Sequence, residues 1–243
     1  MIPVYVVNLE ADVAKLQNIR DQVAGYDFLN LIRVPGVDGT TLPSAACYPL
    51  TRNEWSVNHK GTLGCFLGHA HAWEIIAESE DPFSLCIEDD VRLYNLDILN
   101  GLRVPNGIDL VFCNDRTCYQ PGGGVPSFLP LPPALAHAMT HGSIGSYGYL
   151  LTPAGARNLL DFVKQDSFFS HVDLRLFAYG ITHAEADAIE LPEFRIARDM
   201  CAVRRTYDAA HYIETRVLSP FLTEHVGGPD SRRAAADIPV LPC

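Results

Sequence analysis

Residues 4–23 of the chain read VYVVNLEADVAKLQNIRDQV, and they pass from a strand pattern directly into a helical one. The apolar run VYVVNL is short and rich in β-branched side chains, as in a strand that is buried on both faces. Asp12 can then cap a helix whose apolar residues Leu16, Ile19 and Val23 recur at offsets of three and four. A strand followed by a helix is the repeating unit of α/β domains.

The same alternation continues along the chain. Further strands are predicted at 31–37, 83–87, 109–114 and 146–152, and further helices at 64–80, after Thr152-Pro153, and at 172–179. This order predicts an α/β fold with a mostly parallel sheet flanked by helices. In such sheets, ligands bind beyond the carboxyl ends of the strands.

Three stretches depart from this pattern. Residues 40–60 are polar and irregular, and residues 120–135 are so rich in glycine and proline that they predict a loop and not a helix or a central strand. A loop as long as the second is usually functional, and we expect it to close over a substrate or to shape its site. The C-terminus is poor in core-forming residues. We therefore expect one domain over 1–225 and a peripheral tail over 226–243.

Composition excludes several classes of protein. The 243 residues include 18 basic and 29 acidic side chains, and this net charge of −11 argues against general nucleic-acid binding. No apolar run approaches the roughly 18 residues of a membrane helix, and the N-terminus does not resemble a signal peptide. The seven cysteines form no CxxC pair. We therefore expect a reducing, cytoplasmic location, with peripheral contact to the inner membrane as a second option.

Three adjacent carboxylates, Glu88, Asp89 and Asp90, follow the predicted strand at 83–87. They repel one another, so the cluster is costly without a counter-charge, and oxygen ligands suit Mg²⁺ or Mn²⁺. If the strand continues, Glu88 and Asp90 project to one face and Asp89 to the other. This predicts Asp90 as the main metal ligand, with Glu88 or Asp89 behind it. An acidic turn at a strand end is the alternative.

Two other side chains are candidates for chemistry. Asp173 is a lone acid in an apolar segment, so it is either a general base or the cap of the helix that follows. His69 shares a helix face with Trp73, one turn further on, and the simplest interpretation is a buried, hydrogen-bonded histidine. His71 is two residues from His69 and lies on another face, so a two-histidine metal site is not expected.

Five segments, taken in order, resemble glycosyltransferase family 25, which includes the lipooligosaccharide-biosynthesis and procollagen-type galactosyltransferases. They are VYVVNLEADVAKL (4–16), VPGVDGTTL (34–42), LGCFLGHAHAW (63–73), LCIEDDV (85–91) and GSYGYLLTPAGARNLL (145–160). Asp173 falls where the family usually carries an aspartate. Three positions depart from the family pattern: Gly68 stands where a serine is usual, Thr62 where a glutamate is usual, and Thr152, conservatively, where a serine is usual.

The resemblance implies a GT-A-type, Rossmann-like fold and a nucleotide-sugar donor, commonly a UDP-hexose such as UDP-galactose. It also implies inversion at the anomeric carbon, transfer to the hydroxyl of an acceptor glycan, hydroxylated residue or other hydroxyl compound, and Mn²⁺ or Mg²⁺ as cofactor. Asp173 would be the catalytic base, and Asp90, Glu88 and Asp89 would hold the metal. The donor-binding residues implied are Asn8, Leu9, Lys15, Asp38, His69, Glu88 and Asp89.

Two other functions fit the same residues. A metal-dependent nucleotidyltransferase also places acids at a strand end, but it transfers the nucleotide and not the sugar. A non-catalytic nucleotide-sugar-binding domain would keep the fold and the donor site without turnover. The departures at Gly68 and Thr62 motivate this second alternative.

Overall fold

The computed structural model describes most of the chain. The described residues are 1–43, 60–120, 122, 125–140, 144–166, 171–182, 184–185, 188 and 213–226. The tail predicted over 226–243 therefore lies outside them except for its first residue, as do residues 44–59 of the predicted loop over 40–60.

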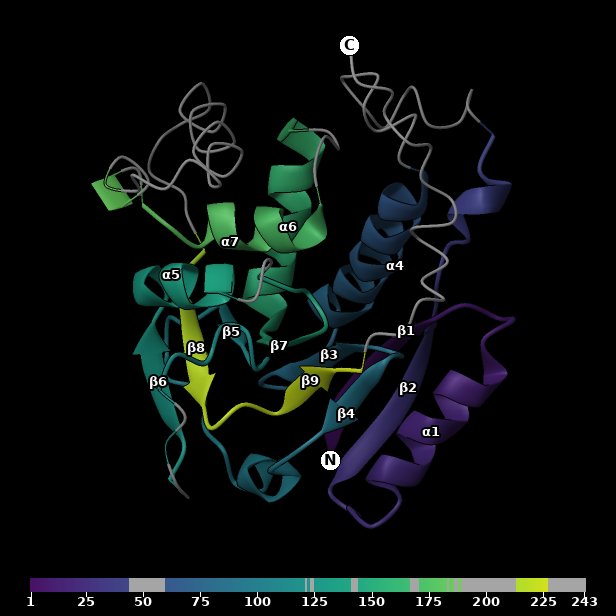
Figure 1. The fold of residues 1–243 in the computed structure, drawn as a ribbon, viewed down its shortest axis with the longest axis horizontal. Helices are drawn as coiled ribbons and strands as arrows, with labels where there is room; N and C mark the ends of the chain where they lie inside the picture. The colour runs from purple at the N-terminus through teal and green to yellow at the C-terminus, as the bar shows by residue number, and fades with distance from the viewer. Residues whose placement is uncertain are drawn as a thin grey trace.

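A seven-stranded sheet in the order β2-β1-β3-β7-β5-β8-β6 forms the centre of the fold (Figure 1). Its strands are β1 (Ile2–Asn8), β2 (Leu29–Pro35), β3 (Ser84–Glu88), β5 (Leu110–Phe112), β6 (Ser127–Pro130), β7 (Gly148–Leu151) and β8 (Thr215–Ser219). The pairings make β6 and β7 antiparallel to their neighbours, whereas the other strands share one direction. A small second sheet pairs β4 (Val91–Leu93) with β9 (Thr223–His225).

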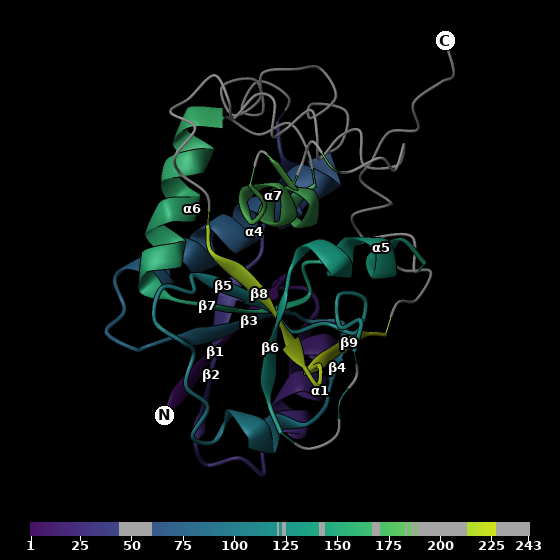
Figure 2. The same ribbon diagram turned by 90° about the vertical axis from the view of Figure 1, so that its left-hand side faces the viewer.

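Helices cover both faces of the large sheet (Figures 1 and 2). On one face lie α4 (Lys60–Ala77), α5 (Pro132–Thr140), α6 (Pro153–Asp166) and α7 (Val172–Tyr179), and on the other lies α1 (Val13–Val23). Short 3-10 turns span Gly39–Thr41 and Leu96–Leu99.

Strand alternation divides the core into two clusters. In β1, Tyr5 packs with the cluster under α4 to α7, whereas Val4 and Val6 pack with α1 and the Leu96–Leu99 turn. All three side chains are buried, as expected for a strand with helices on both faces. The predicted α/β class with a mostly parallel, helix-flanked sheet is confirmed.

Local signals placed several elements correctly. Thr152 caps α6, since its hydroxyl accepts a hydrogen bond from the Gly155 backbone N–H at 3.0 Å. The predicted helix at 172–179 is α7, and it ends at Gly180. α4 begins at Lys60, four residues before the predicted start, and ends at Ala77, before the Asp81-Pro82 signal.

The prediction of a loop throughout 120–135 is wrong from residue 127 onward. β6 pairs with β8 at the edge of the sheet, where proline is tolerated, and Pro130 is its last residue. α5 then begins with Pro132 and Pro133, which cost little in the first turn because the N–H groups there have no helical partner. A lid over the substrate therefore cannot span this whole stretch.

Gly68 has a packing role in this fold. A Cβ atom at this position would lie 2.6 Å from Cγ1 of Val7, so glycine lets α4 approach β1 closely. The departure from the serine that is usual in the resembling family is therefore explained by helix–sheet packing in this chain.

Candidate active site

Polar side chains gather at the carboxyl edge of the sheet. Asn8 is the last residue of β1, and Glu88 is the last residue of β3. Asp115 follows β5, and Tyr147 precedes the reversed strand β7, so both lie at the same edge. This is the edge at which α/β sheets bind ligands.

Asp89 is held by Asn8 and Lys15. The Asn8 side-chain amide donates to Oδ2 of Asp89 at 2.7 Å, and Nζ of Lys15 lies 3.4 Å from Oδ1. Arg33 fixes the amide, because its Nε donates to Oδ1 of Asn8 at 2.9 Å. Burial raises the pKa of the Asp89 carboxyl, and Asn8 and Lys15 only partly oppose this effect.

Asp90 lies between two basic side chains. Its Oδ2 is 3.9 Å from Nζ of Lys15 and 3.5 Å from Nε2 of His225. Its Oδ1 is buried and has no hydrogen-bond partner among the residues that the structure describes. A buried carboxylate oxygen without a partner is costly, and a bound cation would remove that cost.

The residues around Asp90 fit a divalent cation. Asp89 and Asp90 offer carboxylate oxygens, and His225 offers an imidazole nitrogen once it is neutral. The unpartnered Oδ1 of Asp90 could accept a cation, and repulsion from Asp90 adds a smaller share to the rise in the pKa of Asp89 that burial chiefly causes. Hard oxygen ligands of this kind suit Mn²⁺ or Mg²⁺.

Glu88 contacts Ser146 and His69, whereas Asp89 and Asp90 contact Lys15. β3 ends at Glu88, so strand alternation does not extend to Asp89 and Asp90, and Lys15 contacts both of them. Glu88 instead accepts a hydrogen bond from Ser146 Oγ at 2.8 Å. Its Oε1 also lies 3.5 Å from Nε2 of His69.

His69 is fully buried, and its partners confirm the predicted face shared with Trp73. Nδ1 of His69 and Nε1 of Trp73 each lie 2.8 Å from the Tyr149 hydroxyl. The His69 ring is 0% exposed. Its implied role in binding the sugar donor would therefore be indirect, through its contact with Glu88.

His225 and Tyr147 complete the edge, and both were missed in the sequence. The two rings lie 5.4 Å apart, and the Tyr147 hydroxyl donates to Oδ1 of Asp115 at 2.6 Å. Burial, and then this hydrogen bond, raise the pKa of Tyr147, so the phenol stays protonated. The guanidinium of Arg116 lies 5.4 Å above the same ring. No local motif marks His225, since only the pairing of β9 with β4 brings it to Asp90.

Asp173 lies in the first turn of α7, and His171, not Asp173, occupies the cap position. Its Oδ2 accepts from the Gly145 backbone N–H at 3.2 Å, and its Oδ1 accepts from the Leu174 N–H at 2.9 Å. Gly145 precedes Ser146, which contacts Glu88. Asp173 is therefore linked to the carboxyl edge through this loop, and its carboxylate is also engaged with the helix start.

Two predicted donor residues have local structural roles. Asp38 accepts hydrogen bonds from the Thr40 backbone N–H at 2.9 Å and from its hydroxyl at 2.6 Å, which caps the Gly39–Thr41 turn. Leu9 follows β1, and its carbonyl accepts from the Asp12 N–H at 3.0 Å.

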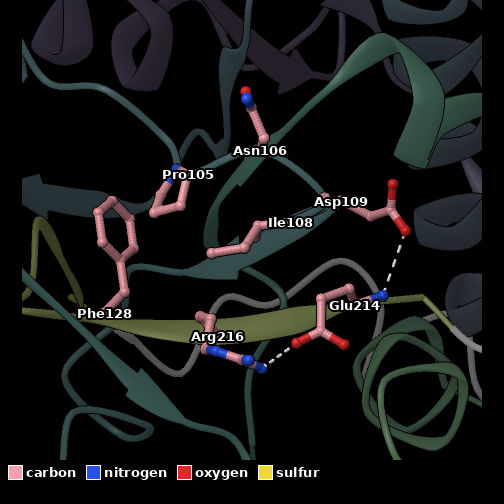
Figure 3. A pocket seen from close by; sticks show the side chains of 8 residues that line it. Pro105, Asn106, Ile108, Asp109, Phe128, Glu214 and Arg216 are labelled. Carbon is pink, nitrogen blue, oxygen red and sulfur yellow. Dashed lines mark hydrogen bonds and ion pairs between the residues drawn. The ribbon is translucent and has the colours of Figure 1, made fainter.

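A surface pocket of about 720 Å³ lies at the opposite, amino edge (Figure 3). Asp109, Glu214 and Arg216 line it, before or within the starts of β5 and β8. Oδ2 of Asp109 accepts from the Glu214 N–H at 3.1 Å, and Glu214 forms an ion pair with Arg216. Both acids thus have polar partners here, and Arg216 neutralises the charge of one of them.

The fold and the acidic carboxyl edge define an α/β protein built to bind a ligand beyond its strands. Residues 1–105 match the sequence model of the family described as Glycosyltransferase family 25 (LPS biosynthesis protein), which confirms the predicted resemblance. The matched part includes β1, α1, α4, β3 and the acidic triplet. Over these 105 residues the chain is similar to that family, and the rest of the chain lies outside the match.

Similar solved structures are also glycosyltransferases. GlyE of Streptococcus pneumoniae TIGR4 is 11% identical with a TM-score of 0.42, and the match covers 94% of this chain and 55% of that one. An enzyme involved in glycosylating the major capsid of PBCV-1 is 9% identical at TM-score 0.40, with 98% and 99% covered. LgtC, in the form of an active-site mutant, is 11% identical at TM-score 0.41, with 94% and 88% covered.

This chain spans about half the length of GlyE, and likeness at these TM-scores is too distant to support conclusions about its chemistry. No curated protein matches the chain. Among the described residues, no helix is both long and apolar enough to cross a membrane.

Proposed function

We propose that the protein is an inverting, metal-dependent glycosyltransferase that moves a hexose from a UDP-sugar to an acceptor hydroxyl. The observation that carries this proposal is the carboxylate of Asp90: its buried Oδ1 has no hydrogen-bond partner among the described residues, and its Oδ2 lies near Lys15 and His225, while Lys15 also contacts Asp89. An edge with this excess of carboxylate suits a complex of a divalent cation and a diphosphate.

Asp90 and Asp89 would hold the cation, with His225 as a further ligand. Asn8 and Arg33 keep Asp89 oriented, because the amide is fixed from both sides. A bound Mn²⁺ or Mg²⁺ would neutralise the charge that develops on the leaving diphosphate. Lys15, whose side chain is more than one-third exposed, can contact both the acids and a phosphate oxygen.

Asp173 is the proposed general base. Its Oδ2 would take the proton of the acceptor hydroxyl, and the loop Gly145–Ser146 links it to Glu88 at the same edge. Both of its oxygens accept backbone hydrogen bonds, so the carboxylate is fixed in position before a substrate binds.

The choice of UDP-galactose as donor, the inversion, and acceptors of the glycan or hydroxylated-residue kind rest on the resemblance to family 25. A cytoplasmic location is proposed with them. The free thiols Cys65, Cys86, Cys113 and Cys118 accord with a reducing compartment.

A donor screen tests the proposal. Wild-type protein is incubated with Mn²⁺ and a panel of UDP-, GDP- and CDP-sugars, and the released nucleoside diphosphate and the thermal shift are both measured. UDP-galactose should give the largest response, and a chelator should remove it. Stabilisation by GDP or CDP but not UDP would contradict the donor assignment. Transfer of the nucleotide itself would identify a nucleotidyltransferase instead.

A further inference from the structure

A second cluster of metal-ligating side chains lies behind the acidic edge. Cys65 and His69 are one turn apart on α4, so they share a face of the helix, and Glu88 meets them from the end of β3. The thiol sulfur, an imidazole nitrogen and a carboxylate oxygen of these residues all lie within 4.8 Å of one another.

His69 is oriented for ligation. Its Nδ1 lies 2.8 Å from the Tyr149 hydroxyl, which also accepts from Trp73. When a metal is bound, the remaining ring proton would stay on Nδ1 and be donated to Tyr149, and the lone pair of Nε2 would face the ion beside Glu88. This nitrogen is fully buried, 3.5 Å from Oε1 of Glu88, and has no hydrogen-bond partner among the described residues.

The distances suit one small cation. Two ligands about 2.0–2.3 Å from a tetrahedral ion lie roughly 3.3–3.8 Å apart. The pair of His69 and Glu88 already meets this distance at 3.5 Å. The thiol of Cys65, a partly exposed residue, lies within 4.8 Å of both of these ligand atoms. Ser146 holds Glu88 from its other side through a 2.8 Å hydrogen bond.

We propose that Cys65, His69 and Glu88 form a site for a borderline-soft divalent cation of the Zn²⁺ type. A thiolate and an imidazole favour such an ion over Mg²⁺ or Mn²⁺. Those two harder ions suit the other site, where Asp89 and Asp90 offer carboxylates and His225 an imidazole. The three protein ligands leave a fourth position for water. The site fastens α4 to the end of β3 and so fixes Glu88 next to the donor-binding edge.

Cobalt titration of the metal-stripped 243-residue chain tests the site. One equivalent of Co²⁺ should produce a thiolate-to-cobalt charge-transfer band and the visible bands of a tetrahedral ion, and Zn²⁺ should displace both. Cys65→Ser should lose the charge-transfer band and weaken binding at least about 10-fold. Cys118→Ser is the matched control, because Cys118 is a free, buried thiol outside the cluster and its loss should leave the band unchanged.

Two outcomes would overturn the proposal: no charge-transfer band with excess Co²⁺, or an unchanged band in Cys65→Ser. Circular dichroism of each variant shows whether it folds, and Cys65→Ala repeats the test if serine does not. The variant Asp90→Asn distinguishes this site from the proposed metal site at Asp90. The variant should keep the cobalt band and lose Mn²⁺-dependent UDP binding. The Cys65–His69–Glu88 site and the Asp90 site are thus tested independently.

Discussion

The two edges of the large sheet both carry acidic side chains, yet they use them differently. At the amino edge, Asp109 and Glu214 are engaged by a backbone N–H and by Arg216. At the carboxyl edge, Asp89 and Asp90 share Lys15, and Asp90 keeps a buried oxygen without a hydrogen-bond partner among the described residues. The hollow of about 720 Å³ lies at the first edge, and the unsatisfied charge lies at the second.

A hollow at a sheet edge therefore does not by itself mark a site for a charged ligand. In the pocket of Figure 3, Arg216 neutralises Glu214, and the hydrogen bond from Glu214 to Asp109 holds the starts of β5 and β8 together. The carboxyl edge concentrates carboxylates, an ammonium and an imidazole where the strands end, as a site for a charged ligand requires.

Replacing Asp90 should have the largest effect. Asp90→Asn removes the charge that would hold the cation, and turnover should fall by roughly 10³-fold or more, because such ions supply several kcal/mol to the transition state. Mn²⁺-dependent stabilisation by UDP should disappear in a thermal-shift assay. Arg216→Gln at the amino edge is the control and should keep that stabilisation. Equal UDP and Mn²⁺ binding by Asp90→Asn and wild type would place the metal elsewhere.

Asp173→Asn should reduce turnover by about 10²–10⁴-fold with little change in donor affinity, as expected for loss of a general base. The assay is kcat and KM for the donor found in the screen. A purely structural role predicts another pattern. The asparagine amide would disturb the Gly145 contact and lower the melting temperature, while kcat per folded molecule stayed near the wild-type value.

Gly148→Ala tests how the C-terminal strands support the carboxyl edge. A Cβ at this position would overlap the Thr223 hydroxyl, so the substitution forces β7 and β9 apart. Such overpacking costs about 1–3 kcal/mol of unfolding free energy, measured by denaturant titration. Gly25→Ala is the matched control, since nothing lies within 4 Å of its Cβ position. A similar loss in both variants would mean that the close contact has no special role.

The smallest effect is expected for His225, which should make the unfolding free energy of the metal-free protein depend on pH. Its hydrogen bond to Asp90 raises the pKa of the imidazole, Glu88 adds to this rise, and burial and Arg116 oppose it. The contribution of the pair of His225 and Asp90 to stability is therefore complete at a pH below the pKa of His225 in the unfolded protein, about 6.5. It is lost as the pH rises through the pKa of His225 in the folded protein. Because the pair is partly exposed, we expect less than about 1 kcal/mol.

Denaturant titrations of wild type and His225→Asn across this range measure the effect. The difference in unfolding free energy between them should shrink as the pH rises. A difference that stays constant or grows with pH would contradict the pairing with Asp90.

Local sequence was sufficient for the elements whose signals lie within a few residues. The strand–helix run at 4–23, the Thr152 cap and the stop at Gly180 each depend on near neighbours, and each is present in the structure. The acidic triplet was also correctly placed after a buried strand, because apolar length and flanking residues define that strand. The strand β8, by contrast, was not predicted, although it lies between β5 and β6 in the sheet.

Only the tertiary structure decided which partners the carboxylates of the triplet contact and which distant residue completes the site. Glu88 turns to His69 on α4, whereas Asp90 meets His225, which is 135 residues further along the chain. Side-chain direction after a strand end depends on the turn that follows, and no period of two or 3.6 residues extends through it. The contacts of β9 and α4 form when distant segments pack, so their residues carry no local pattern that marks them as parts of one site.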